Sequence, residues 1–307
     1  MKLATVALII ALTAGYAVGQ SETPTLRIVT ESPNLPSELF YGDIKVKPVR
    51  LRPGTNTVIT INDSDFFVHQ HYVDFLSRMP DQQGFNFWVN EIASCGGNAS
   101  CVEFRRINTS GAFFLSIEFR NTGYFVYRLH KASFGNFPKY QSFMPDTREV
   151  AKDVVVGQGD WQGQLEANQD AFAKAWVTRP EFVAEYGTLN GDAFVGAILS
   201  KAGLTQGDVP YTDIVNALNA SGNSTAGRAA ALRAIVDSPS FDQKEKNPAF
   251  VLMQYFGYLR RDPDAAPDVD LSGFNFWLNK LNQFGGDFHA AEMVKAFIVS
   301  GEYNGRF

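Results

Sequence analysis

The chain has 307 residues, of which 45% are hydrophobic, 19% charged and 13% aromatic. This composition is that of a folded globular protein, and it excludes disordered and collagen-like proteins. The net charge of −5 is spread along the chain without a basic stretch that would contact phosphates, so we expect no nucleic acid as a partner. At about 100–200 residues per domain, the length allows about two domains.

The first 19 residues have the features of a secretory signal peptide. Lys2 precedes an apolar run from Leu3 to Thr13, and the small residues Ala17 and Gly19 occupy the −3 and −1 positions of a cleavage site. A membrane anchor would need about 18 or more uninterrupted apolar residues, which this run lacks. We therefore predict a signal peptide over 1–19, a secreted, periplasmic or cell-surface protein, and no transmembrane segment after cleavage.

The two cysteines, Cys95 and Cys101, flank the turn-forming sequence GGNAS. An exported protein reaches an oxidising compartment, which favours joining such a pair. A metal site would need companion ligands that the neighbouring sequence lacks, and a catalytic cysteine would need a thiolate that oxidation removes. We therefore predict a structural disulfide that closes a small loop.

Residues 20–62 are predicted to form a short β or extended segment. Residues with β-branched side chains gather at 26–30, 43–51 and 57–61, and turn-forming sequences separate these runs. Pro48 lies within the middle run, so a strand there is expected at the edge of a sheet.

From residue 64 onward the periodicity is helical, and the sequence repeats itself. Seven of fifteen positions are identical in the best gapless match, a level that chance does not give. The repeated segments are 67–81 and 250–264, GFNFW at 84–88 and 273–277, and AFFLSIEF at 112–119 with AFIVSGEY at 296–303.

Two fainter copies lie between the first and the last. One combines residues 125–138 with 171–182, and the other combines 194–204 with 233–241. We therefore predict a mainly α fold, in which four degenerate helical repeats follow the N-terminal segment. Repeats one and two are expected within residues 63–187, and repeats three and four within residues 188–307.

The GFNFW motif is predicted to open the second helix of the repeat, with its glycine at the turn. Because it recurs, we expect Phe87, Trp88, Phe276 and Trp277 to pack into the core. Trp161 lies outside this motif between two glycines, and it is the better candidate for an exposed aromatic side chain that stacks on a sugar.

A small polar residue ends the third helix of each repeat and is predicted to cap the next helix. These N-cap residues are Ser116, Thr178, Ser238 and Ser300. Glutamates follow in the first turn, where the helix dipole favours negative charge, at Glu118, Glu181 and Glu302. Capping explains this pattern without a catalytic serine.

The combined pattern of Y-x-x-(F/Y)-L-x-R-x-P-D, G-F-x-F-W and A-F-x-x-S-x-E resembles the secreted bacterial family catalogued as domain of unknown function 4214. The resemblance covers residues 64–135 and 249–304. That family is similar to the helical linker domains of phycobilisomes. The resemblance implies a helical fold and an exported protein, and it assigns no activity and no functional residue.

The chain lacks the G-x-S-x-G, H-E-x-x-H, C-x-x-C and P-loop motifs. We therefore expect a non-catalytic structural or protein-interaction module, with an extracellular protein or a component of the cell envelope as its partner. The alternative is an extracellular polysaccharide-binding or polysaccharide-hydrolysing protein, whose paired carboxylates could come from any of 32 acidic residues. No catalytic residue and no cofactor is assigned.

The last repeat has eight residues between its Pro-Asp pair and GFNFW, where the first repeat has two. In this insertion Asp268, Asp270 and Ser272 precede Gly273 and reproduce the D-x-D-x-S-G opening of an EF-hand-like calcium loop. The twelfth position, which should supply a bidentate Glu, is Asn279. The loop is therefore either a weak calcium site or a solvated insertion.

Overall fold

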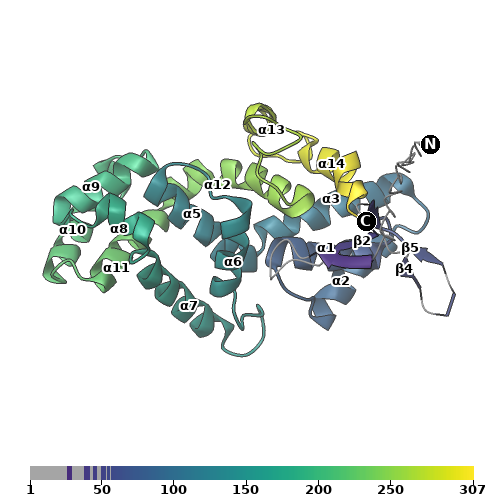
Figure 1. Cartoon of the computed structure of the whole chain (residues 1–307), viewed down its shortest axis with the longest axis horizontal. Coiled ribbons are helices and arrows are strands. Elements are labelled where there is room, and N and C mark those ends of the chain that lie inside the picture. The colour runs from purple at the N-terminus through teal and green to yellow at the C-terminus, as the bar shows by residue number, and fades with distance from the viewer. Residues whose placement is uncertain (1–25, 30–37, 42–43, 47–49, 53, 56) are drawn as a thin grey trace, which may run out of the picture. The chain divides into compact units, whose positions relative to one another are not determined.

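The structure, a computed structural model, describes residues 26–29, 38–41, 44–46, 50–52, 54–55 and 57–307. The chain divides into two compact units, residues 1–48 and 49–307. The predicted signal peptide and Pro48 lie outside the described residues. The predicted fold class is confirmed, because short strands near the N-terminus precede a chain that is mainly α-helical (Figure 1).

The described part of the first unit contains strands β1 (Leu26–Val29), β2 (Glu38–Tyr41) and β3 (Ile44–Val46), which form an antiparallel sheet in that order. The register pairs Leu26 with Tyr41 and Leu39 with Val46. The second unit begins with a separate antiparallel pair, β4 (Arg50–Leu51) and β5 (Val58–Ile59). The sequence did not predict β2, since ELFY is short and pairing on both edges, rather than its own propensity, makes it a strand.

The helices are grouped by the repeat whose predicted range contains them, in chain order. The first repeat contains α1 (Ser64–Leu76), α2 (Gln82–Ala93), α3 (Ala99–Leu115) and α4 (Ile117–Asn121). The second contains α5 (Gly123–Phe134), α6 (Tyr140–Val150), α7 (Trp161–Trp176) and α8 (Pro180–Tyr186). The third contains α9 (Gly191–Ala202), the 3₁₀-helix η1 (Gln206–Asp208), α10 (Tyr211–Ala220) and α11 (Thr225–Val236).

Helix α12 (Pro239–Gln254) joins the third repeat to the fourth and continues into the π-helix η2 (Tyr255–Leu259). The fourth repeat ends with α13 (Ser272–Gln283), α14 (Met293–Ile298) and α15 (Gly301–Gly305). The first helix of the last repeat is thus the end of α12 together with η2, at the position that α1 has in the first repeat.

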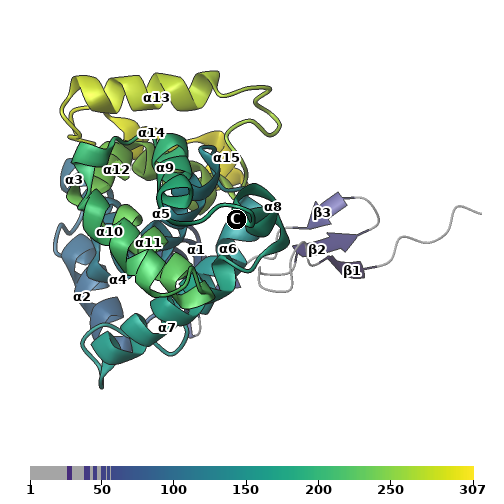
Figure 2. The same cartoon turned by 90° about the vertical axis from the view of Figure 1, so that its left-hand side faces the viewer.

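The first and last repeats pack against each other although they are far apart in the sequence. Helix α1 contacts η2, and α3 contacts α14. The second and third repeats are joined in turn, because α5 contacts α9 and α11, and α7 contacts α11. In Figure 1, α8 to α11 gather at the left end of this helical unit, and α13 and α14 lie on its upper side. Figure 2 shows α13 along the top edge.

Aromatic rings fill the core between the first and last repeats. Phe75 of α1 meets Tyr258 of η2 edge-on, with ring centroids 5.3 Å apart, and Tyr258 meets Tyr303 of α15 at 4.9 Å. All three side chains are buried. Edge-on ring pairs of this kind add about 0.5–1.5 kcal/mol to the burial of the rings themselves.

Three of the four predicted N-caps are confirmed. Ser116, Ser238 and Ser300 each accept a hydrogen bond from a backbone N–H of the next helix, at 3.0, 3.3 and 3.1 Å. The prediction for Thr178 is wrong, since its hydroxyl donates backwards to the Ala175 carbonyl at 2.8 Å. The N-cap of α8 is the following residue, because Pro180 fixes the first helical position one residue later.

The prediction that the GFNFW aromatics are core residues is wrong for two of the four. Phe87 and Phe276 are 55% and 57% exposed, and Trp88 and Trp277 are half-buried. Consecutive side chains on a helix point about 100° apart, so a helix covered on one side buries the tryptophan in part and leaves its neighbour in solvent. In both repeats the phenylalanine lies edge-on to the tryptophan, with centroids 4.8 and 4.9 Å apart.

The glycine of the motif serves a close approach rather than a turn. Gly84 and Gly273 already lie inside α2 and α13. A Cβ at Gly84 would overlap the Tyr72 hydroxyl, and a Cβ at Gly273 would lie 2.8 Å from the Tyr255 hydroxyl. The repeated glycine therefore lets the first and second helices of each repeat approach closely.

Candidate functional site

Residues that the first and last repeats share meet where the first helix of the repeat ends. In the first repeat, Arg78 donates from Nε and Nη2 to the two carboxylate oxygens of Glu118, at 2.6 and 2.7 Å. In the last repeat, Arg261 donates to Glu302 through the same atoms, at 2.6 and 3.1 Å. Each repeat thus carries the same bidentate ion pair, which ties its first helix to its last.

The same arginine also lies over a tyrosine ring in both repeats. The guanidinium carbon is 4.9 Å from the ring centroid of Tyr72 in the first repeat and 5.5 Å from that of Tyr255 in the last. Burial raises the pKa of each tyrosine hydroxyl to about 12, so both remain protonated at neutral pH. The arginine is therefore held between an aromatic face and a carboxylate.

The inserted loop changes which aspartate completes the site. In the first repeat Asp81 lies 3.5 Å from the arginine, and the sequence alignment matches it with Asp264. In the last repeat Asp264 instead pairs with Lys139 at 2.9 Å, and Asp268 contacts Arg261 at 2.8 Å. The six extra residues therefore place a different carboxylate beside the repeated arginine.

In the last repeat these residues line a pocket of about 280 Å³. Its most deeply buried lining residues are Tyr255 and Phe297, its half-buried ones include Leu259, Trp277 and Ala296, and its more exposed ones are Asp268 and Glu302. The pocket thus has an apolar interior and an acidic rim.

The corresponding glutamate of the first repeat is more deeply buried. The Glu118 side chain is 6% exposed, whereas that of Glu302 is 35% exposed. Ile117 precedes the glutamate in the first repeat, and Gly301 stands at that position in the last. The same motif therefore forms a buried ion pair in one repeat and the rim of a pocket in the other.

The three residues of the calcium hypothesis have other partners. Asp268 pairs with Arg261, and Asp270 accepts a hydrogen bond from the Ser272 backbone N–H at 2.8 Å, which together with the Ser272 hydroxyl lowers the pKa of that carboxyl. Within the described parts of the chain, no group of three or more His, Cys, Asp or Glu side chains could hold a metal ion. Calcium binding at this loop would require Asp268 to leave its arginine.

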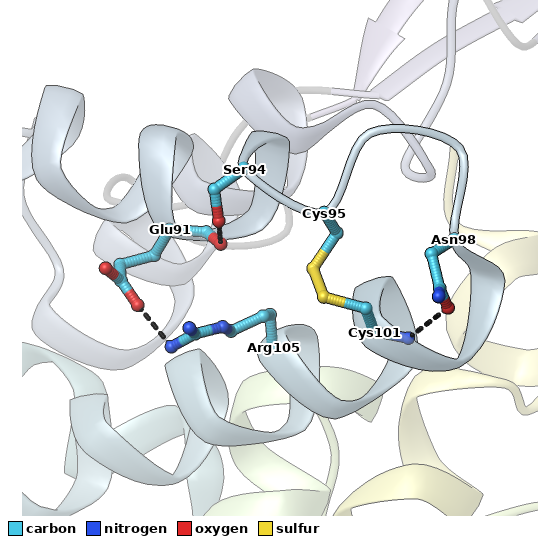
Figure 3. Close-up of a disulfide and its surroundings, with 6 residues drawn as sticks. All are labelled: Glu91, Ser94, Cys95, Asn98, Cys101 and Arg105. Carbon is cyan, nitrogen blue, oxygen red and sulfur yellow. Dashed lines mark hydrogen bonds and ion pairs between the residues drawn. A yellow bond between two sulfur atoms is a disulfide. The ribbon is translucent and has the colours of Figure 1, made fainter.

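The predicted disulfide is present between Cys95 and Cys101, whose Cα atoms are 5.5 Å apart (Figure 3). Asn98 within the loop caps α3 by accepting from the Cys101 backbone N–H at 3.0 Å. Glu91 lies four residues before Cys95 and Arg105 four residues after Cys101, and these two side chains form an ion pair at 2.5 Å. These contacts fasten α2 to α3.

We expect neither cysteine of the exported protein to react with an alkylating agent before reduction. Intact-mass spectrometry should find no added alkyl group on native material, and two after reduction under denaturing conditions. Two additions without reductant would show that the bridge does not form in the cell. Reduction alone should cost less than the ~2–4 kcal/mol of a typical disulfide, because the closed loop is short.

Trp161 begins α7, next to its N-cap Asp160. It is half-buried and lines an open hollow of about 490 Å³ together with the exposed side chains of Asp153, Gln158 and Gln164. The hollow lies outside the shared motif, as the sequence indicated. The hollow places an indole ring beside hydrogen-bonding side chains, so a sugar ring could stack on the indole and hydrogen-bond to its neighbours.

A buried polar cluster joins the first repeat to the last. Asp74 of α1, with 3% of its side chain exposed, accepts hydrogen bonds from Arg260 at 2.8 Å and from Arg306 at 2.9 Å. Nearby, the His71 ring lies within hydrogen-bonding distance of the hydroxyls of Ser110 and Tyr258, and all three residues are buried. The carboxylate, the imidazole and the two side chains with hydroxyls are buried, so the cluster joins the two repeats within the core.

Neither ion-pair system was predicted from the sequence. A signal for the first was present, because the arginine and the glutamate are each retained in both matched repeats. No such signal pointed to the ion pairs of Asp74, since the matched position in the last repeat is Gly257.

No family model, curated protein or solved structure was found to match the chain. No helix in the described residues is long and apolar enough to cross a membrane.

Proposed function

We propose that the chain is an exported, non-catalytic module that binds another protein outside the cytoplasm. Export is supported by the N-terminal sequence and agrees with the Cys95–Cys101 disulfide. The resemblance of residues 64–135 and 249–304 to a secreted helical family of unknown function stays a prediction.

The proposal rests on which side chains of the shared motif have partners within the chain and which lie in solvent. Its charged and hydroxyl groups form internal ion pairs and helix caps, which stabilise each repeat. The same motif leaves apolar side chains in solvent at matched positions of the first and last repeats. These are Phe87 and Phe276, 55% and 57% exposed, and Leu115 and Val299, 45% and 61% exposed. A single exposed apolar side chain is ordinary on a protein surface, but its recurrence at two matched pairs of positions supports a surface that binds another protein.

The test is site-specific photo-crosslinking in the organism that exports the protein. With p-benzoylphenylalanine in place of Phe276, we expect a discrete adduct with a second protein. The same residue in place of Lys174, which is exposed on α7, should give no adduct at that mass. Equal labelling at both positions, or none at Phe276, would count against a protein partner on this surface.

The hollow beside Trp161 favours a second candidate function, the binding of an extracellular polysaccharide. If that function is correct, neutral oligosaccharides should quench the tryptophan fluorescence of the wild type and leave that of Trp161→Phe unchanged. A saccharide response together with no crosslink at Phe276 would favour this candidate over a protein-interaction module.

A further inference from the structure

The pocket of the last repeat combines an apolar lining with charged groups at its rim. Its volume of about 280 Å³ is just below the range of about 300–1,000 Å³ typical of sites that enclose whole small molecules or cofactors. An apolar interior bounded by Tyr255, Phe297 and Trp277 favours an apolar guest. The pocket therefore fits one apolar side chain.

The rim determines which charge the guest must carry. A guanidinium has five N–H donors, and those of Arg261 are all used within the chain: three by Glu302 and Asp268, and two by the carbonyls of Asp262 and Ala265. Arg261 therefore offers no donor to a ligand. Its two carboxylate partners outnumber it, so the rim carries a net negative charge, and each carboxylate oxygen has a second lone pair that can accept a hydrogen bond.

The surroundings do not cancel this negative charge. Lys280 lies 5.6 Å from the Trp277 ring centroid, but it pairs with Glu292 at 3.7 Å. An acidic guest would be repelled at the rim, whereas a basic one would be attracted. Charge complementarity thus points to a guest with positive groups beside its apolar anchor.

The shared residues are arranged differently in the first repeat. It has the same arginine, tyrosine and tryptophan, but the side chain of its glutamate, Glu118, is 6% exposed, whereas that of Glu302 is 35% exposed. Only the last repeat has the insertion that supplies Asp268. The exposure of Glu302 and the presence of Asp268 therefore make the acidic rim of the last repeat.

We propose that this pocket binds a hydrophobic side chain of a partner protein that is flanked by lysine or arginine. The proposal rests on the proposed function as a protein-interaction module and names the part of the partner that is recognised. The apolar side chain would enter beside Trp277, and the flanking cations would contact Asp268 and Glu302.

The probe is the peptide acetyl-arginyl-leucyl-arginine amide, added to the mature full-length protein with ¹⁵N-labelled tryptophan. The four indole N–H signals report binding separately, and the Trp277 signal is assigned from its loss in Trp277→Phe. We expect a saturable shift of that signal. Serine in place of leucine in the probe should weaken binding about tenfold or more, and glutamate in place of both arginines should abolish it.

Two matched variants test the location without changing any charge. Ala296 lines the pocket on α14, and Ala112 occupies the matched position on α3; both are half-buried. Ala296→Leu fills the pocket and should weaken probe binding at least fivefold, whereas Ala112→Leu should change it less than twofold. Asp268→Asn should weaken binding less than Ala296→Leu does, and should reduce its dependence on salt.

Equal binding by the two leucine variants, or equal binding of the basic and acidic probes, would overturn the proposal. So would a Trp277 shift with neutral oligosaccharides and none with the basic probe. If photo-crosslinking at Phe276 succeeds while the probe leaves Trp277 unchanged, the protein-interaction function stands and the assignment of this pocket fails. If neither succeeds, both fail.

Discussion

Replacing Asp74 with alanine is expected to lower the free energy of unfolding by about 3–5 kcal/mol, because it removes a buried carboxylate to which two largely buried guanidiniums donate. Arg260 and Arg306 are 18% and 13% exposed, and both donate to this one side chain. Arg306 also donates to the carbonyls of Gly257 and Tyr258 at 2.9 and 2.7 Å. Asp74 therefore holds the C-terminal end of the chain and the end of η2 against α1.

Urea unfolding followed by far-ultraviolet circular dichroism measures this change. Asp213→Ala, at an exposed position of α10, is the control, and we expect it to stay within about 0.5 kcal/mol of the wild type. A loss below about 1 kcal/mol in Asp74→Ala would mean that water reaches the two arginines and that the first and last repeats are not joined through them.

The helical part of the fold could be predicted because its signals are local and repeated. The match between residues 67–81 and 250–264 identified two helices that occupy the same place in their repeats, α1 and the end of α12 with η2. The serine caps were predictable for the same reason, since an N-cap acts on a backbone N–H three residues away. The Thr178 cap failed where Pro180 imposed a stronger local constraint.

Contacts between distant elements could not be read from these local signals. Asp74 and Arg306 are 232 residues apart in the chain, and no motif links them. The exposure of Phe87 and Phe276 was missed for a different reason. An aromatic residue that recurs in two repeats indicates that both repeats need it, but recurrence does not tell whether its side chain is buried or exposed.

The candidate site could be predicted from the sequence only in part. Its arginine, glutamate, tyrosine and tryptophan are all repeated, so their importance was visible in the sequence. Which aspartate joins them was not, because the alignment without gaps matched Asp81 with Asp264. Only the path of the inserted loop brings Asp268 to Arg261 and creates the acidic rim.

Acidification from pH 6.5 to pH 4 is expected to lower the free energy of unfolding by about 3 kcal/mol through His71 alone. Burial lowers the pKa of this histidine from 6.5 to about 4. Its Nδ1 lies 2.8 Å from the Phe67 carbonyl and donates to it, so Nε2 is left to accept from the Ser110 hydroxyl. A proton on Nε2 would remove that acceptor, and the nearby guanidiniums of Arg106 and Arg306 disfavour the added charge.

The sign follows from which state binds the proton. Above pH 6.5 the ring is neutral in both the folded and the unfolded chain, and its full contribution to stability is present. As the pH falls from 6.5 toward 4, the unfolded chain binds a proton that the folded chain refuses, so stability is lost across this window. Half-buried His130, whose pKa burial also lowers to about 4, adds a second loss over the same range.

Urea unfolding at pH 7, 6, 5 and 4 separates the two histidines from the carboxylates that titrate near the acid end. The amide of His71→Gln can still donate and accept but does not titrate in this window, so its stability should fall less steeply with acidification than that of the wild type, by up to about 1.4 kcal/mol per pH unit. His71→Gln/His130→Gln should be flatter still. If the wild type and His71→Gln lose stability in parallel, then the folded and the unfolded chain protonate this ring over the same pH range, and burial does not lower its pKa.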